Sequence, residues 1–260
     1  MKSIHQCALL AALSISPLAL VATPAVAEDY VQFGMGVDYS TGDYGDIADT
    51  KILAVPFSAK YNAGNFFVRG SIPYLHIKGP GSVVAGDGGA VPGGASGPVT
   101  SNDGIGDLSL SAGYALPLSD STTLDVTGRV KVPTASESKS LGTGTTDFTA
   151  EAGITQQYGQ FSLNARGGRR FNGSSNLFPL NDVWLAGAGA YYQAGDLTLG
   201  LDYDWREASL PTASDRSEMT ASATYKLSPQ LRLQGYGYTG FTDGSPNAGG
   251  GLQLLYRFGL

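Results

Sequence analysis

The sequence predicts an all-β fold, a single closed antiparallel transmembrane β-barrel of about twelve strands with short periplasmic turns and longer extracellular loops. Three observations predict it. Runs in which apolar and polar residues alternate recur from residue 31 to the end of the chain. The connections between these runs are alternately short and long. The N-terminal segment has the features of an export signal, which would carry the rest of the chain out of the cytoplasm.

Residues 1–27 are predicted to be a secretory signal peptide, and residues 28–260 the barrel. An apolar run ends in Ala25-Val26-Ala27, a small-residue pattern typical of a cleavage site. The run is interrupted by Pro17 and is too short for a membrane-spanning helix. Removing 27 of the 260 residues would leave 233 and would remove Cys7, the one cysteine. A disulfide framework and a cysteine metal site are therefore excluded.

The composition excludes several classes of protein. The signal segment holds one Lys and no acid, so the formal charge of −6 becomes −7 without it. This negative charge argues against nucleic acid as a partner. The chain has 37 glycines and 42% apolar residues, which fits neither a disordered chain nor a soluble helical protein. After the signal there is no apolar run of the roughly 18 residues that a membrane helix needs.

The clearest strand is residues 197–206, LTLGLDYDWR. Leucines, Tyr203 and Trp205 fall on one side, whereas Asp202, Asp204 and Arg206 fall on the other. Successive strand side chains point to opposite faces, so this strand has an apolar face and a charged face. In a membrane barrel the apolar face meets lipid and the charged face lines the lumen.

Taken in order, the same alternation predicts twelve strands. They lie at about residues 31–39, 53–61, 66–74, 108–116, 124–132, 148–155, 161–166, 183–192, 197–206, 218–227, 231–241 and 250–260. Short turns are expected at about residues 62–64, 118–121, 158–159, 194–196 and 228–230, and the other six connections are longer. An even strand number with this alternation is the pattern of outer-membrane barrels. Both termini are then periplasmic.

Some features fit this pattern less simply. Pro56 and Pro73 lie inside runs, where each removes a ladder hydrogen bond, so we expect a bulge or a strand end there. Residues 231–241 change phase at Gly235-Tyr236, which suggests another bulge. Residues 183–192 are apolar or glycine on both sides, so their phase is open. The alternative fold is a soluble sandwich or lipocalin-like barrel. Aromatic residues at the ends of the apolar faces, and charges mid-strand, count against it.

The polar faces carry the candidate site. Inward-facing candidates are Asp38, Lys60, Arg69, Asp107, Asp125, Arg129, Lys131, Glu151, Arg166, Arg170, Asp202, Asp204, Arg206, Glu218, Lys226, Arg232 and Arg257. The predicted selectivity set within them is Arg69, Arg129, Lys131, Glu151, Arg166, Arg170, Asp202, Asp204, Arg206 and Arg257. One interpretation is a structural network of cross-strand ion pairs. The other is a charged constriction with basic and acidic groups on opposed walls, which would orient a dipolar or anionic solute.

The longest connection, about residues 79–104, is rich in Gly, Pro and Ser. It lacks the GxxxxGK[ST] pattern and any βαβ context, so a phosphate-binding loop is not indicated. A surface loop that folds inward and narrows the pore is one interpretation of its length.

An outer-membrane lipid-modifying enzyme is a rival interpretation. It would need a His with a nearby Ser and a carboxylate or Asn. After residue 27 the chain has one histidine, His76, and no Gly-x-Ser-x-Gly elbow. Metal ligands are equally sparse, so neither catalysis, a metal nor another cofactor is expected. A closed structural or adhesive barrel is the remaining alternative.

Three segments resemble a known family. They are the Tyr44-Gly45-Asp46 turn, VPFSAKYNAGNFFVRGSIPYLHIKGPG at residues 55–81 and GIGDLSLSAGYAL at residues 104–116. Together they resemble outer-membrane transporters of the "MetA-pathway of phenol degradation" family. The resemblance implies a proteobacterial outer-membrane barrel and a channel for small aromatic or other organic solutes, without a residue-level site. Many such barrels end on an aromatic residue, whereas this chain ends on Leu260, which keeps the outward phase.

These observations predict a passive channel for small solutes in the cell outer membrane. The expected partners are outer-membrane lipid, lipopolysaccharide, the small-molecule solutes, and the barrel-assembly machinery during biogenesis. Nucleic acid is not expected as a partner.

Overall fold

The computed structural model describes residues 29–80, 83–86, 89–92, 98–176 and 178–260. The predicted signal peptide lies outside these residues. Within them, fifteen strands and one short 3-10 helix occur in the following order. They are β1 Tyr30–Gly42, β2 Thr50–Ala63, β3 Phe66–Pro80, β4 Val83–Gly86, β5 Gly89–Pro92, β6 Val99–Ile105, β7 Leu108–Pro117, β8 Thr122–Val132, η1 Glu137–Lys139, β9 Asp147–Tyr158, β10 Phe161–Phe171, β11 Val183–Ala194, β12 Leu197–Arg206, β13 Arg216–Lys226, β14 Leu231–Gly240 and β15 Ala248–Gly259.

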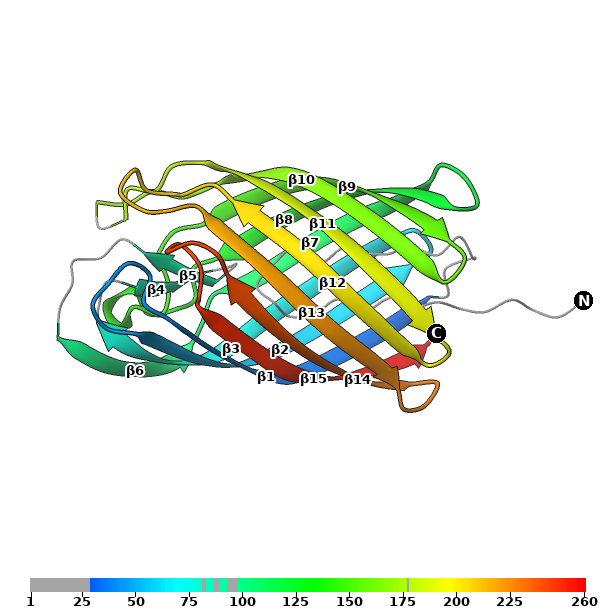
Figure 1. Cartoon of the computed structure of the whole chain (residues 1–260), viewed down its shortest axis with the longest axis horizontal. Helices are drawn as coiled ribbons and strands as arrows, with labels where there is room; N and C mark the ends of the chain where they lie inside the picture. The colour runs from blue at the N-terminus through cyan, green and yellow to red at the C-terminus, as the bar shows by residue number, and fades with distance from the viewer. Residues whose placement is uncertain (1–28, 81–82, 87–88, 93–97, 177) are drawn as a thin grey trace, which may run out of the picture.

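Twelve of these strands close into an antiparallel barrel (Figure 1). The twelve are β1–β3 and β7–β15. Each pairs with the next of these strands along the chain, and β15 returns to pair with β1. The start of β1 and the end of β15 lie at the same end of the barrel as the short turns, as predicted, because Tyr30 pairs with both Gly259 and Asn62. Gly159 and Gly195 lie in two of these turns with φ of +61° and +63°, a region that glycine adopts without steric cost. Among the described residues, no helix is long and apolar enough to cross a membrane.

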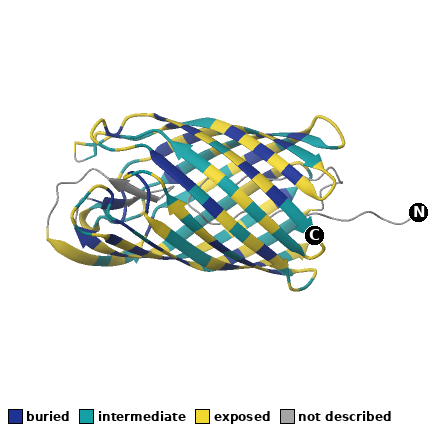
Figure 2. Ribbon diagram, viewed as in Figure 1, coloured by how far each residue is buried: buried dark blue, intermediate teal, exposed yellow. Residues whose placement is uncertain are grey.

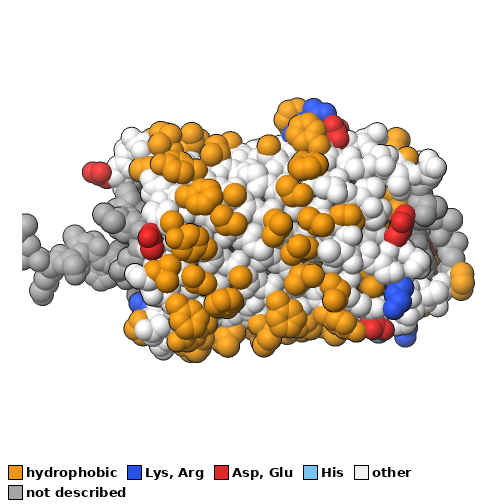
Figure 3. All heavy atoms as spheres, turned by 180° about the vertical axis from the view of Figure 1, so that it is seen from behind, with side chains coloured by type: hydrophobic (Ala, Val, Ile, Leu, Met, Phe, Trp, Pro, Cys, Tyr) orange, Lys and Arg blue, Asp and Glu red, His pale blue; other side chains and the backbone are white. Residues whose placement is uncertain are grey.

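Burial alternates along most of the barrel wall, and the pattern is inverted relative to a soluble protein, with apolar side chains exposed and polar side chains buried. Figure 2 shows buried and exposed residues in a chequerboard over the barrel. On β1, Phe33 and Met35 are more than half exposed, whereas Asp38 is 5% exposed. The largest fully buried side chains include Lys131, Gln234 and Glu218. Hydrophobic side chains cover much of the outer face (Figure 3). This is an outer-membrane barrel, with apolar side chains toward lipid and polar ones toward the lumen.

The two prolines lie opposite each other. Pro56 of β2 pairs with Pro73 of β3. Beside Pro56, the pairing of β1 with β2 is interrupted between the pairs Met35–Phe57 and Asp38–Ala54. Beside Pro73, the partner of β3 changes from β7 to β6, and the register shifts by one residue. That shift is a bulge, as predicted for Pro73, and the N–H of Gly106 donates to the Pro73 carbonyl at 2.8 Å.

Two expectations need correction. The register of β14 with β13 and with β15 is constant, so the bulge predicted at Gly235-Tyr236 is absent. Instead, Tyr236 and Tyr238 continue the inward phase of Arg232, and glycines occupy the outward positions between them. The connection at residues 79–104 is also not one continuous loop, because its last part is β6, which pairs with the outer half of β3. The open phase of β11 is now clear, since Val183, Leu185 and Tyr191 are buried on the inward side.

Candidate functional site

The lumen wall is the candidate site, and the ten residues of the predicted selectivity set all have the inward phase of their strands. Each is buried or half-buried, and the residues on either side belong to the outward face. The set comprises Arg69 on β3, Arg129 and Lys131 on β8, Glu151 on β9, Arg166 and Arg170 on β10, Asp202, Asp204 and Arg206 on β12, and Arg257 on β15.

Arg166 and the two aspartates of β12 form one cluster. The Arg166 guanidinium forms an ion pair with Asp204 and lies 3.7 Å from Asp202, and its side chain is 4% exposed. The Tyr191 hydroxyl donates to Asp202, and Arg166 donates to the Asn164 amide oxygen at 3.3 Å. These charges were expected on opposed walls. They are instead on strands separated only by β11, and their side chains are in direct contact.

Glycine on the intervening strand makes this contact possible. Gly187 of β11 lies between Arg166 of β10 and Asp204 of β12 in the cross-strand register. A Cβ at Gly187 would lie 2.7 Å from Cζ of Arg166, closer than non-bonded carbons approach. The guanidinium therefore crosses β11 over the bare backbone. The glycines that left the phase of this strand open in the sequence thus allow the ion pair to form.

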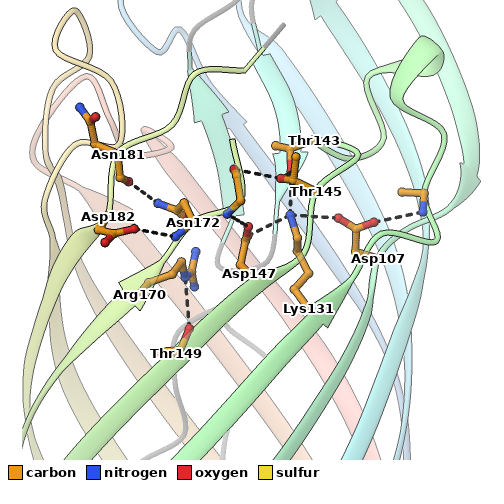
Figure 4. Close-up of polar contacts among 12 residues, drawn as sticks. Asp107, Lys131, Thr143, Thr145, Asp147, Thr149, Arg170, Asn172, Asn181 and Asp182 are labelled. Atoms are coloured by element: carbon orange, nitrogen blue, oxygen red, sulfur yellow. Dashed lines mark hydrogen bonds and ion pairs between the residues drawn. The ribbon is translucent and has the colours of Figure 1, made fainter. Parts of the chain in front are cut away.

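Lys131 is the centre of a second cluster near the outer ends of the strands (Figure 4). Its Nζ lies 2.9 Å from Asp147 Oδ2 and 3.5 Å from Asp107 Oδ2, and it donates to Thr143 Oγ1 at 2.6 Å. Asp107 in turn accepts from the Ala135 N–H at 3.0 Å. The ammonium is 1% exposed, so this buried charge is paired on several sides. The cluster ties the β8–β9 connection to the barrel wall.

A third cluster includes residues that sequence reasoning missed. Asp38 accepts from the hydroxyls of Tyr236 at 2.9 Å and Tyr238 at 3.1 Å. Nearby, Glu218 of β13, which is buried, forms an ion pair with Arg216. Asp38 and Glu218 were among the inward candidates, but the tyrosines and Arg216 were not. The signal that could have found the tyrosines is their parity with Arg232.

An apolar cluster covers part of the outer end of the lumen. Inward-facing side chains of β2 and β3 pack there with side chains from three connections. The members of this outer apolar cluster are Tyr44, Ile52, Ala54, Leu75, Ile77, Val83 and Leu141. Val83 and Leu141 are 2% and 1% exposed, so β4 and the β8–β9 connection lie over the inward face of the wall. Burial also raises the pKa of the Tyr44 phenol, which therefore stays neutral.

No group of three potential metal ligands occurs among the described residues. His76, which the enzyme interpretation would require, is exposed on the outward face of β3. Its Nε2 lies 3.3 Å from Ser101 Oγ on β6. Asp103, its register partner, accepts from the Tyr74 hydroxyl at 2.6 Å. The histidine thus has a serine beside it, but the nearby carboxylate bonds a tyrosine.

Comparisons with known proteins agree with this architecture. A family model described as "Putative MetA-pathway of phenol degradation" matches residues 46–258. The COG4313 outer membrane channel from Pseudomonas putida F1 superimposes with a TM-score of 0.67 at 13% identity, covering 93% of this chain and 100% of the other. The NanC porin gives 0.54 at 11% identity, covering 88% and 100%. The KdgM porin gives 0.53 at 9% identity, covering 86% and 99%. No curated protein matches the sequence.

Proposed function

The chain belongs to the MetA-pathway of phenol degradation family, and on that premise we propose that it is a passive outer-membrane channel for small solutes. The observation that carries the proposal is the lining of the closed barrel. Charged side chains follow the inward phase of strands around the whole wall, and a dry interior would make so many ionised groups costly. A water-filled lumen solvates them and also lets solutes pass.

The solute class we propose is small polar or aromatic organic molecules. The family description supports an aromatic compound, and the Tyr30 and Phe67 rings at the periplasmic end support it chemically. Lys60 Nζ lies 4.9 Å from the Phe67 ring centre and 5.6 Å from that of Tyr30, so cationic and aromatic groups share this end of the wall. Catalysis and a cofactor have no part in the proposal.

The conductance of the protein tests this function directly. We expect the chain from residue 28, refolded and inserted into a planar lipid bilayer, to produce discrete current steps. Charged side chains at the wall should make those steps ion-selective. Folding is checked independently by the mobility shift that unheated barrels show in detergent gels. A folded protein that gives no current steps would contradict the channel and favour the second candidate.

The second candidate is a closed structural barrel. The Arg166 and Lys131 clusters and the outer apolar cluster favour it, because each joins elements of the wall or its connections. It predicts a folded protein that is silent in the bilayer and excludes solutes from liposomes. A lipid-modifying activity has one observation in its favour, the Ser101–His76 contact.

We expect His76→Ala to leave both conductance and lipid composition unchanged, because the nearby carboxylate of Asp103 bonds Tyr74 rather than orienting the imidazole. The measurement is phospholipid hydrolysis by the refolded protein, with Ser101→Ala as a second variant that removes the other partner of the contact. Hydrolysis by the unmodified chain that both variants lose would establish the enzyme instead.

We also propose that outer-membrane lipid and lipopolysaccharide surround the barrel and that the assembly machinery inserts it. The exposed apolar belt supports the lipid contact. Lys51 of β2 and Lys78 of β3 are both exposed and lie directly opposite each other on the outward face. Two like charges in that position repel each other, and an anionic lipid headgroup would relieve the repulsion.

A further inference from the structure

We propose that the outward-facing lysines Lys51 and Lys78, at the outer ends of β2 and β3, form a binding site for a phosphomonoester group of lipopolysaccharide. The general lipid contact proposed above thereby acquires a defined place on the barrel and a defined chemical group. The proposal rests on the barrel lying in the outer membrane and is independent of whether it conducts solutes.

The cross-strand register places four hydrogen-bond donors in one row on the outer surface. Lys51 pairs with Lys78. Thr41 of β1 pairs with Lys51 on its other side, and Ser101 of β6 pairs with Lys78. The members of this lysine row are therefore Thr41, Lys51, Lys78 and Ser101. Directly opposed residues of an antiparallel pair have Cβ atoms about 4.5–5.5 Å apart, so both ammonium groups can reach a single phosphate.

The two lysines lack a protein counter-ion. In the part of the chain that the structure describes, neither Lys51 nor Lys78 forms an ion pair or a side-chain hydrogen bond. Two acids are close along the strands. Asp103 on β6 accepts from the Tyr74 hydroxyl at 2.6 Å, and the exposed Asp49, two residues before Lys51, has no ion pair with either lysine among those residues.

Opposed like charges destabilise a pair of strands. An anion bound between Lys51 and Lys78 would offset both charges at once. A third positive charge is nearby, because Lys139 Nζ lies 3.3 Å from the Asp103 carbonyl oxygen on β6. The surface around the row therefore favours an anion.

The height of the row along the barrel matches the lipid headgroups. Phe66 and Tyr74 are outward-facing aromatic residues of β3, eight positions apart and 42% and 46% exposed. In a strand tilted by about 40° they are separated by roughly 21 Å along the barrel axis, close to the apolar band of about 25 Å. Tyr74 therefore lies at the outer interface, where aromatic residues are enriched.

Lys78 is four residues beyond Tyr74, which places it roughly 10 Å further out along the axis. The headgroup layer occupies the first roughly 5–7 Å outside the hydrocarbon. A long lysine side chain can reach back over that difference and place its ammonium group at the level of the phosphates.

The charge of the ligand decides between the lipids of the outer leaflet. A phosphomonoester carries a charge of about −1.5 to −2 at neutral pH, which two ammonium groups can balance. The phosphodiester of a phospholipid carries one negative charge and would leave one lysine uncompensated. Lipopolysaccharide presents phosphomonoesters on the sugars that carry its acyl chains. The hydroxyls of Thr41 and Ser101 can donate further hydrogen bonds to the phosphate oxygens.

The test measures binding of lipid A, the lipopolysaccharide anchor with its phosphomonoesters, to the refolded chain from residue 28. Fluorescently labelled lipid A in a neutral detergent reports the dissociation constant by anisotropy. Lys51→Gln/Lys78→Gln should raise that constant at least about 10-fold, because each lysine near an anionic lipid surface contributes to binding. Lys51→Arg/Lys78→Arg should keep the affinity. Lys51→Glu should lose binding, because the glutamate would pair with Lys78 itself.

Arg169→Gln/Lys226→Gln is the matched control, since it removes two positive charges from outside the row. Arg169 faces outward on β10 beside Asp182, and Lys226 is half-buried at the periplasmic end of β13. Its affinity for lipid A should equal that of the unmodified chain. Folding is checked by the gel mobility shift, and the single Lys78→Gln variant serves if the double variant does not fold.

Three results would overturn the proposal. One is an unchanged affinity in Lys51→Gln/Lys78→Gln, and another is equal binding of lipid A from which the phosphates have been removed. Equal binding of phosphatidylglycerol would assign the lysines to a phospholipid instead. Conductance is measured on the same samples and should not change in the glutamine variants, so failure of the channel and failure of the lysine row are distinguished.

Discussion

Replacing Arg166 with Met is expected to lower the free energy of unfolding by about 3–5 kcal/mol, the range for removing one partner of a buried ion pair. The guanidinium contacts both Asp204 and Asp202, whose side chains are 16% and 17% exposed. Methionine has a similar length but no charge. Two carboxylates that are only partly exposed to solvent would therefore remain beside each other without the arginine that pairs with them. Urea unfolding in lipid vesicles, followed by the fluorescence of the two tryptophans, measures the change.

Arg169→Met is the matched control for this prediction. Arg169 is on the same strand, but its side chain is 40% exposed and it lies 3.5 Å from an equally exposed Asp182. An exposed ion pair contributes about 1 kcal/mol or less. Adding Asp204→Asn to Arg166→Met should recover part of the lost stability, because it removes one of the stranded charges. Equal losses from the two arginine variants would show that the buried cluster adds nothing beyond a surface pair.

Shortening the β3–β6 connection is expected to raise single-channel conductance at least about two-fold, because conductance depends on the width of the narrowest section. Pro80 and Val99 are register partners, so an Asn-Gly turn in place of residues 81–98 can join them as a hairpin. The deletion removes Val83 from the outer apolar cluster and uncovers the inward face of β2 and β3. The measurement is the current step in symmetric salt.

A point substitution tests the same prediction without shortening the chain. Leu141→Ser weakens the same cluster while leaving the chain length unchanged, and it should raise conductance in the same direction. Ile47→Ser makes the same type of change at a residue that is 102% exposed, so its conductance should not change. An unchanged current in the shortened protein would remove the gating role of this connection.

The sequence by itself determined the membrane barrel. Alternation with period two, as in LTLGLDYDWR, gives each strand one apolar and one polar face. Aromatic residues at the ends of the apolar faces, charges mid-strand on the polar faces, and the alternation of short and long connections then favour a membrane barrel and define which end is which. Six long and five short connections follow from these local signals alone. So does the inward phase of the ten residues in the predicted selectivity set. Each inference uses only residues close together along the chain, and strand geometry turns that spacing directly into a face.

Only the tertiary structure decided which inward side chains meet. Arg166 and Asp204 are 38 residues apart and touch because both lie in register with the same glycine of β11. The closed sheet likewise places Arg257 and Lys60 in register on either side of Gln32, which no single strand encodes. The same holds for the tyrosines that reach Asp38 across β15 and for Val83, whose place against β2 and β3 depends on how a long connection folds back. Register and closure are properties of strand pairs, so they were decided by the packing of the whole barrel.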